Sequence, residues 1–194
     1  MYRLVIFDFD DTLLTLGVSW TAVKKDVLTL AKQEGIAVSD QHLVSLGNSL
    51  SNTPERKKAI DEIYLRHEMG CVQKKAYTVF PDMFDLAKEI KASGRMTAIA
   101  SGNHSSTIKR ILSDLDALDS FDYICGRESV ENNKPAPDQL NMIMERLGID
   151  KQEAFFVGDS MNDEAAAKSA NISYFKIRPG NKSDIIRLRK LLFI

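Results

Sequence analysis

The segment LVIFDFDDT at residues 4–12 decides the fold class of this chain. Its first four residues are apolar without alternation, which is typical of a strand buried on both faces of a parallel sheet. Residues two apart in an extended chain point to the same side, so Asp8 and Asp10 are expected to face one small volume. Two carboxylates about 4 Å apart repel each other by roughly 4 kcal/mol at an effective dielectric constant of about 20, so a divalent cation, an ammonium group or a shared proton is expected beside them.

Further short apolar segments continue this pattern along the chain. We predict strands at residues 96–100, 122–125, 154–157 and 173–177. Amphipathic segments predict helices near residues 82–94, 105–115, 137–148, 160–170 and 181–194. Asp82 is expected to cap the first of these helices. Strands that alternate with helices indicate an α/β fold, a Rossmann-like parallel sheet of about five strands with helices on both faces.

The interval between the first strand and the helix at Asp82 is too long for a plain loop in a compact domain. It carries its own helix signals, with starts expected after Ser19, after Ser39 or Asp40, and after Thr53. The last of these helices is expected to end at Gly70. We therefore predict a small all-helical insert at residues 16–79, and an α/β core made of residues 1–15 and 80–194.

The composition is that of an ordinary globular protein with a net charge close to zero. Lysine and arginine number 26 against 27 aspartate and glutamate residues, so no global basic field indicates nucleic acid as a partner. No apolar run approaches the roughly 20 residues of a membrane span, and the first residues lack the pattern of a signal peptide. Cys71 and Cys125 are not spaced as metal ligands. We expect a cytoplasmic monomer or homodimer that binds neither nucleic acid nor a membrane.

Polar residues follow the predicted strands at 96–100 and 154–157, and a lysine precedes the predicted helix at 137–148. Ser101 and Gly102, followed by Asn103, form an anion seat, because a hydroxyl donates while glycine lets backbone N–H groups approach a ligand. Lys134 precedes a proline, which favours an extended conformation and lets its ammonium group reach inward. Asp159 and Asp163 follow the strand at 154–157. In open parallel sheets, ligands bind beyond the carboxyl ends of the strands, so these clusters are expected at one site.

The charge of this expected site points to a metal ion. Asp8, Asp10, Asp159 and Asp163 carry four negative charges, and Lys134 offsets only one of them. Mg²⁺ prefers hard oxygen ligands of this kind. Carboxylates, one lysine, a hydroxyl and an anion seat together indicate phosphoryl chemistry.

Each of these residues also has a purely structural interpretation. Asp8 and Asp10 could cap a turn after the strand, and Ser101 could be a helix-entry residue. Lys134 taken alone could be a solvated loop lysine. Asp163 could serve only the start of a helix, because the spacing from Ser160 to Asp163 is that of a capping box.

Four motifs in order along the whole chain resemble the haloacid dehalogenase-like hydrolase superfamily. The segment DFDDTL at residues 8–13 resembles its first motif, Ser101 the second, Lys134-Pro135 the third and GDSMND at residues 158–163 the fourth. The predicted insert stands where family members carry a helical cap. The arrangement is similar to small-metabolite phosphatases of the phosphoglycolate phosphatase and β-phosphoglucomutase kind, many of which have glycine at the position of Asp11.

This resemblance implies a Mg²⁺-dependent phosphatase that hydrolyses a small phosphorylated metabolite through an aspartyl-phosphate intermediate. It implies that Asp8 is the nucleophile and that Asp10 protonates the leaving oxygen and then deprotonates the attacking water. The implied metal ligands are Asp8, the backbone carbonyl of Asp10, and Asp159, with Asp163 as a further ligand or a neighbour of the ligands. Two alternatives stay open: a phosphomutase on the same scaffold, and a non-catalytic phosphate-binding regulatory module.

The resemblance also implies which residues hold the phosphate, while the substrate itself stays unnamed. Ser101 and Lys134 are expected to hold phosphoryl oxygens and take part in catalysis, together with the anion-seat residues Gly102 and Asn103, and Thr12 is expected to support the first motif. Substrate contacts are expected from the insert, with candidates Trp20, Asn48, Arg56 and Lys57, although a core position suits Trp20 better.

Overall fold

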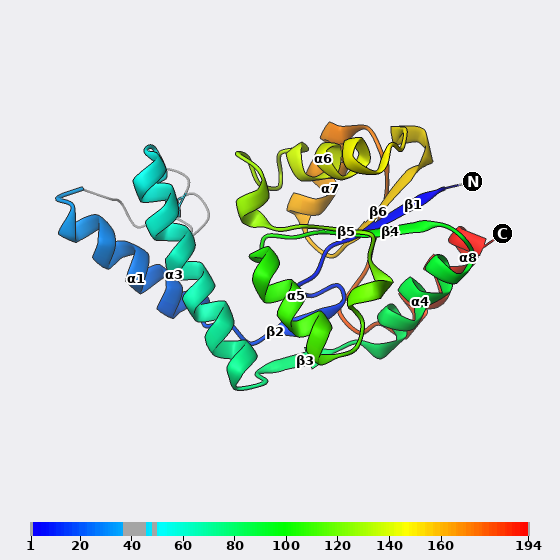
Figure 1. Cartoon of the computed structure of the whole chain (residues 1–194), viewed down its shortest axis with the longest axis horizontal. Helices are drawn as coiled ribbons and strands as arrows, with labels where there is room; N and C mark the ends of the chain where they lie inside the picture. Colours follow the sequence, from blue (N-terminus) through cyan, green and yellow to red (C-terminus); the bar gives the residue numbers. More distant parts are fainter. Residues whose placement is uncertain (1, 37–45, 48–49, 194) are drawn as a thin grey trace. The chain divides into compact units, whose positions relative to one another are not determined.

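The computed structural model describes residues 2–36, 46–47 and 50–193 (Figure 1). The chain forms two compact units, an α/β unit made of Met1–Leu16 with Tyr77–Ile194 and a helical unit made of Gly17–Ala76. The helix predicted after Ser39 or Asp40 lies outside the described residues except for its buried Leu46, and Asn48 also lies outside them. Within the described part of the chain, every helix is too short or too polar to cross a membrane.

The α/β unit is built on a parallel sheet with the strand order β5-β4-β1-β6-β7. Its strands are β1 Leu4–Phe7, β4 Met96–Ala100, β5 Tyr123–Cys125, β6 Ala154–Gly158 and β7 Ser173–Lys176. Every residue of β1 is buried, because β1 lies between β4 and β6 and helices cover both faces of the sheet. The predicted fold class, an α/β protein with a parallel sheet of about five strands, is confirmed.

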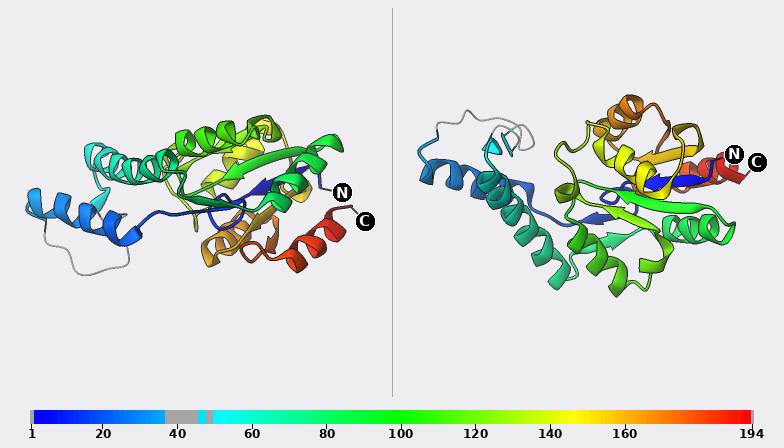
Figure 2. Two further views of the ribbon diagram at one scale, coloured as in Figure 1. Left: turned by 90° about the horizontal axis from the view of Figure 1, so that it is seen from below. Right: turned by 45° about the horizontal axis from the view of Figure 1, so that its top comes forward.

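Helices cover both faces of this sheet (Figures 1 and 2). The helices of the α/β unit are α4 Pro81–Ala92, α5 Ser105–Asp114, α6 Asp138–Leu147, α7 Met161–Ala170 and α8 Lys182–Phe193. Short 3-10 helices lie at η1 Leu118–Ser120, η2 Arg127–Ser129 and η3 Lys151–Glu153. The apolar faces of α6 and α7 pack on one side of the sheet, where Leu140 and Ala166 join Ile6 in one buried cluster. Helices α4, α5 and α8 lie on the other side.

A two-stranded antiparallel ribbon was not predicted. It consists of β2 Leu14–Leu16 and β3 Tyr77–Val79. Both strands belong to the α/β unit, whereas we had predicted residues 77–79 to lie in the insert. Strands of three residues are too short to show a periodic pattern, so their pairing across sixty intervening residues left no local signal.

Two predicted helix ends differ from the structure. The N-cap of α4 is Phe80 rather than Asp82, because Pro81 takes the first helical position, where a missing N–H costs nothing. Asp82 lies in the first turn, where a carboxylate faces the positive end of the helix dipole. Helix α3 continues past Gly70 to Gln73, and burial of Val72 in that last turn offsets the roughly 1 kcal/mol that glycine costs inside a helix.

The helical unit contains α1 Trp20–Gln33 and α3 Pro54–Gln73. The predicted starts after Ser19 and Thr53 are confirmed, since both side chains accept a hydrogen bond from the first turn of their helix. The two helices are joined by Asp26, whose Oδ2 lies 2.7 Å from Nη2 of Arg66 and 2.8 Å from Nε2 of His67.

Trp20 does not occupy a core position, in contrast to our preferred interpretation. Its side chain is 42% exposed, and its ring centroid lies 6.3 Å from that of Tyr64. Position 20 is the first residue of α1, and the apolar stripe that is buried in this helix begins one turn later, at Val23.

Candidate active site

Lys134 is the centre of a buried cluster of charges. Its Nζ donates to Oδ1 of Asp8 at 2.6 Å, to Oδ1 of Asp163 at 2.6 Å and to the carbonyl oxygen of Ala100 at 3.0 Å. The lysine side chain is only 9% exposed, so the interpretation of a solvated loop lysine is wrong. An ammonium group has three hydrogens, and these three acceptors use all of them. A buried ion is tolerated when it is paired and fully hydrogen-bonded in this way.

Asp163 has two structural partners. Its Oδ2 accepts hydrogen bonds from the backbone N–H of Ser160 at 3.0 Å and from the Ser160 hydroxyl at 2.5 Å, while Oγ of Ser160 accepts from the Asp163 N–H. The predicted capping box at the start of α7 is therefore confirmed. The other oxygen of the same carboxylate binds Lys134. The helix cap thus also holds the buried lysine in place.

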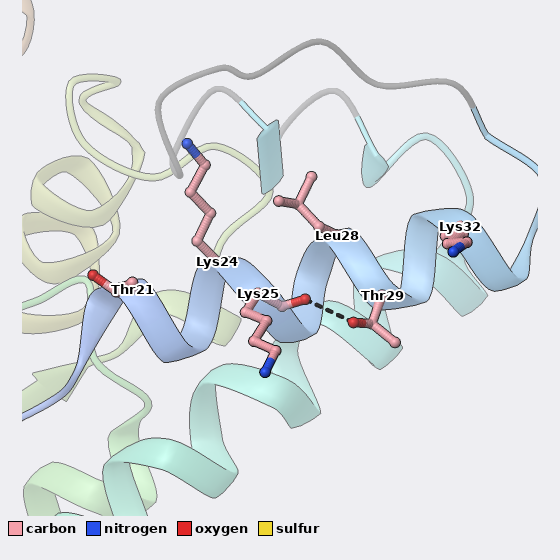
Figure 3. A pocket seen from close by; sticks show the side chains of 6 residues that line it. All are labelled: Thr21, Lys24, Lys25, Leu28, Thr29 and Lys32. Carbon is pink, nitrogen blue, oxygen red and sulfur yellow. Dashed lines mark hydrogen bonds between the residues drawn. The ribbon is translucent and has the colours of Figure 1, made fainter.

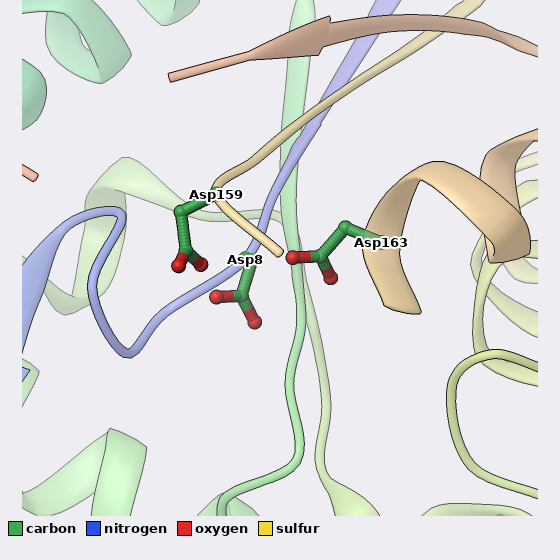
Figure 4. Close-up of side chains that lie close together, drawn as sticks. All are labelled: Asp8, Asp159 and Asp163. Carbon is green, nitrogen blue, oxygen red and sulfur yellow. The ribbon is translucent and has the colours of Figure 1, made fainter. Parts of the chain in front are cut away.

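Three carboxylates converge beside this lysine (Figure 4). Oxygens of Asp8, at the end of β1, Asp159, after β6, and Asp163, in the first turn of α7, all lie within 4.8 Å of one another. Burial and the charge of Asp163 raise the pKa of Asp8 to about 7, although Lys134 opposes this shift. Burial, together with Asp163 and Asp11, raises the pKa of Asp159 to about 6. Carboxylate oxygens are the hard ligands that Mg²⁺ prefers, and a divalent cation would relieve the repulsion among these three groups, so the residues fit the metal that the sequence implied.

Asp10 lies in a turn that follows β1. Strand β1 ends at Phe7, and the carbonyl of Phe9 then accepts hydrogen bonds from the N–H groups of Leu13 and Leu14 in a tight turn. The chain is therefore no longer extended at Asp10, so the two-residue alternation does not apply to its side chain. Oδ1 of Asp10 accepts the backbone N–H of Leu16 at 2.7 Å. Thr12 is buried in the same turn, and its hydroxyl has no hydrogen-bond partner among the described residues.

The Ser101 loop is held by its own side chains and by the chain after β5. The hydroxyl of Ser101 donates to Oδ1 of Asn103 at 3.1 Å and accepts the backbone N–H of Asn103 at 3.1 Å. Helix α5 begins only at Ser105, with His104 as its N-cap. The N–H of Ser105 is occupied by the carboxylate of Glu128 at 3.1 and 3.2 Å, so the helix start itself is already capped.

Glu128 is a residue that our sequence reasoning missed. Burial is the largest single influence and opposes its ionisation, but the hydrogen bonds from Ser105, a backbone hydrogen bond of Glu128 itself and the nearby His104 together lower the pKa of Glu128, so the carboxylate stays charged at the helix start. The available signal was its position directly after β5, at the same edge of the sheet as the other polar clusters.

Comparison with known proteins agrees with this geometry. Residues 5–177 match the family model described as haloacid dehalogenase-like hydrolase. The chain belongs to the haloacid dehalogenase-like hydrolase family. A phosphoglycolate phosphatase of Escherichia coli O157:H7 is 28% identical over 160 residues, which are 82% of this chain and 59% of that relative. A phosphoglycolate phosphatase of Escherichia coli strain K12 is 33% identical over 114 residues. The chain thus spans less than two thirds of the length of these curated relatives.

Solved structures of the family share the fold. A predicted phosphoglycolate phosphatase from Haemophilus somnus 129PT superposes with a TM-score of 0.66 at 18% identity and covers 98% of each chain. CbbY from Rhodobacter sphaeroides, crystallised with xylulose-(1,5)bisphosphate, superposes with a TM-score of 0.62 at 20% identity over 90% of this chain and 85% of that one. At this level of identity, the likeness supports the fold alone.

Asp11 lies in the turn of the first motif and has a positive φ. Its φ is +59°, in the left-handed region that glycine enters without strain and aspartate enters more readily than most residues. The Asp11 side chain offsets the strain locally, because its Oδ1 accepts the hydroxyl of Thr15 at 2.6 Å while its N–H binds the carbonyl of Leu14 at 2.6 Å. These two hydrogen bonds therefore hold Asp11 in a backbone conformation that glycine would enter without strain.

A separate hollow of about 390 Å³ lies along α1 in the helical unit (Figure 3). It is lined by Thr21, Lys24, Lys25, Leu28, Thr29 and Lys32. The hydroxyl of Thr29 donates to the carbonyl of Lys25 at 2.9 Å, as is common inside a helix. None of the acidic site residues lines this hollow, so we do not include it in the candidate site.

We expect Gly158→Ala to distort the acidic cluster. A Cβ at this position would lie 2.7 Å from the Cβ and Cγ of Asp163, which is closer than real contacts allow. We expect a loss of about 1–3 kcal/mol in the free energy of unfolding, measured by urea denaturation, together with weaker Mg²⁺ binding. Gly70→Ala is the matched control, because nothing lies within 4 Å of its added methyl group inside α3. In this control, the free energy of unfolding is expected to rise by about 0.5–1 kcal/mol. A similar rise in Gly158→Ala would contradict the expected clash with Asp163.

Proposed function

We propose that this protein is a Mg²⁺-dependent phosphatase that hydrolyses a small phosphorylated metabolite through an aspartyl-phosphate on Asp8. One observation carries the proposal: Lys134 joins Asp8 to Asp163, and Asp159 completes a carboxylate cluster within 4.8 Å at the carboxyl ends of the strands. This combination supplies a nucleophile, a fixed positive charge and a cation-binding set in one place.

In the first step, an oxygen of Asp8 attacks the phosphorus atom and the ester bond to the leaving oxygen breaks. Oδ1 of Asp8 is engaged by Lys134, which orients the carboxylate for attack through its other oxygen. The charge on Asp8 is lost when its carboxylate becomes an acyl phosphate. The N–H of Lys134 that was bound to Asp8 can then donate to a phosphoryl oxygen. The ammonium group thus stabilises the negative charge both before and after the step.

Asp10 is the proposed proton carrier. It gives a proton to the leaving oxygen in the first step and takes one from the water that attacks the phosphorus in the second, which restores Asp8 and releases phosphate. The backbone N–H of Leu16 holds the Asp10 carboxylate in one orientation. Since Leu16 is the last residue of β2, the ribbon that we did not predict positions this group.

The phosphoryl oxygens also need donors and a cation. The proposed donors are the Ser101 hydroxyl and the N–H of Gly102, because the N–H groups of Ser101 and Asn103 already donate to Cys125 and to the Ser101 hydroxyl. Asp8, Asp159 and the Asp10 carbonyl, with Asp163 as a ligand or neighbour, would hold Mg²⁺, which would supply positive charge against the phosphoryl group. The mostly dissociative transition state requires positioning and charge neutralisation, and these groups provide both.

The direct test is phosphate release from para-nitrophenyl phosphate with Mg²⁺ and with EDTA. We expect turnover with Mg²⁺ and almost none with EDTA. A panel of phosphorylated metabolites then identifies the substrate, and 2-phosphoglycolate comes first because curated relatives carry the name phosphoglycolate phosphatase. Equal rates with and without the metal, isomerised esters in place of free phosphate, or phosphate binding with no turnover across the panel would each contradict the proposal.

We expect Mg²⁺ binding to weaken at acidic pH. With a pKa of about 7 for Asp8 and about 6 for Asp159, both carboxylates carry protons below those values, and a cation has to displace them. The affinity should therefore be roughly 100-fold lower near pH 5.5 than near pH 7.5. Titration calorimetry in two buffers of different ionisation enthalpy should show proton release near pH 6. An affinity that does not change over this range would exclude these carboxylates as ligands.

A further inference from the structure

Gln139 is a buried polar residue that the proposed chemistry does not use. It lies in the first turn of α6 and is not exposed at all. Its Nε2 donates to the carbonyl oxygen of Ser101 at 2.8 Å, to that of Gly126 at 3.1 Å and, at 3.4 Å, to that of Cys125. One amide thus joins the loop after β4 to the end of β5.

The orientation of this amide is determined by its surroundings. Three carbonyl oxygens face Nε2, so a flipped amide would place Oε1 against three acceptors. Oε1 itself has no hydrogen-bond partner among the described residues. The only hydrogen bonds that the side chain makes in the described part of the chain are therefore these donations to backbone carbonyls.

The same segment holds the other carbonyls of the Ser101 loop. Nη1 of Arg127 donates to the carbonyl of Gly102 at 2.6 Å, and the backbone N–H of Arg127 donates to the carbonyl of Asn103 at 3.0 Å. Gly126 permits this close approach, because a Cβ there would lie 2.4 Å from the backbone nitrogen of Ser105. Three successive carbonyls of the loop are therefore held by residues 126–139.

Peptide geometry then determines where the N–H of Gly102 points. The carbonyl of Ala100 accepts from Lys134. The N–H of Ser101 donates to the carbonyl of Cys125, and the carbonyl of Ser101 accepts from Gln139. The peptide bond between Ser101 and Gly102 is trans, so the Gly102 N–H points opposite to the Ser101 carbonyl. Across its own trans peptide bond, the Ala100 carbonyl points opposite to the Ser101 N–H, and this carbonyl accepts from Lys134. The N–H and the carbonyl of Ser101 both face the Cys125 side, so we expect the Gly102 N–H on the same side as the Ala100 carbonyl, toward Lys134.

We infer that Gln139, with Arg127, is a positioning residue for phosphate binding. By holding the Ser101 carbonyl, it aims the Gly102 N–H at the phosphoryl group beside Lys134. This inference rests on the proposed function, because it assumes that the loop at residues 101–103 receives a phosphoryl oxygen. An N–H that binds phosphate equally in the ground state and in the transition state changes KM more than kcat.

The test is Gln139→Met, which keeps the approximate shape of the side chain and removes its donor. We expect KM for para-nitrophenyl phosphate and the inhibition constant of inorganic phosphate to rise together by about tenfold, while kcat changes less than twofold. Arg127→Met is the second variant. Its side chain is only partly buried, so the fold should tolerate the change, and we expect a rise of about threefold in both constants.

The matched control is Thr97→Val, which removes a buried hydrogen bond to the Ser120 carbonyl near the opposite end of β4. We expect it to lower the melting temperature without changing KM or the inhibition constant. A merely structural Gln139 would behave in the same way as this control, and that outcome in both loop variants would overturn the inference.

Calorimetric binding of inorganic phosphate in the presence of Mg²⁺ separates the inference from the proposed function. If the wild-type protein binds phosphate but has no turnover, and Gln139→Met weakens that binding, the proposed function fails and the positioning role stands. If the wild-type protein turns over and both loop variants bind phosphate as it does, only the inference fails. If the wild-type protein neither binds phosphate nor turns over, both are wrong.

Discussion

Asp8→Asn should lower the rate of phosphate release by at least about 1,000-fold, because an amide cannot form the aspartyl-phosphate. The fold should persist. In the wild-type protein, burial raises the pKa of Asp8 to about 7, so the ionised carboxylate destabilises the native state when no metal is present. The free energy of unfolding should therefore fall as pH rises from about 4 to about 7, and this fall should be smaller in the asparagine variant.

Two measurements check this expectation. Stopped assays with an aryl phosphate give the rate, and urea denaturation in EDTA at several pH values gives the stability. Asp85→Asn, an exposed residue on α4, is the control and should keep both the rate and the pH dependence of the wild type. An Asp8→Asn variant with at least one tenth of the wild-type rate would show that another group is the nucleophile.

Lys134→Met is expected to have the largest effect on stability. It removes the only donor that the structure shows between the carboxylates of Asp8 and Asp163, and it leaves both charges buried. Removal of one partner from a buried ion pair costs about 3–5 kcal/mol, and we expect a loss of that size near pH 7.5 in EDTA. Activity should fall by at least about 100-fold, because the phosphoryl oxygens lose a positively charged partner and the Asp8 carboxylate loses the donor that orients it.

The pH dependence of this variant distinguishes buried charge from lost packing. Without the ammonium group, which lowers the pKa of Asp8, the Asp8 carboxylate takes up a proton more readily, so stability should recover as pH falls toward about 5. The double variant Lys134→Met with Asp8→Asn should recover part of the stability at neutral pH, because one uncompensated charge is gone. Lys88→Met, at an exposed position on α4, is the control and should change stability by less than about 0.5 kcal/mol. An equally small loss for Lys134→Met would contradict the buried bridge.

Local sequence patterns predicted the strands and helices of the α/β unit well. Segments such as residues 4–7 and 154–157 are apolar throughout, and a strand buried on both faces needs that composition. The capping box from Ser160 to Asp163 was likewise visible, because both of its partners lie within one helical turn. Short-range signals of this kind do not depend on the rest of the chain.

Interactions between distant segments gave no such signal. The pairing of β2 with β3, the turn of Asp10 toward Leu16, and the exposure of Trp20 all depend on which residues meet after folding. Glu128 and Gln139 are ordinary polar residues in the sequence and have a role only because β5 ends beside β4.

The sequence by itself determined the order of secondary structure, the family motifs and the identities of the charged groups at the strand ends. Only the tertiary structure decided which atoms of those groups meet. The strand order places β1 between β4 and β6, so Asp8 and Asp159 converge, and the segment that carries Lys134 brings an ammonium group between two carboxylates. Hydrogen bonds and buried ion pairs depend on positions within a few ångströms, and residues 126 positions apart reach such proximity only through the packing of the whole sheet.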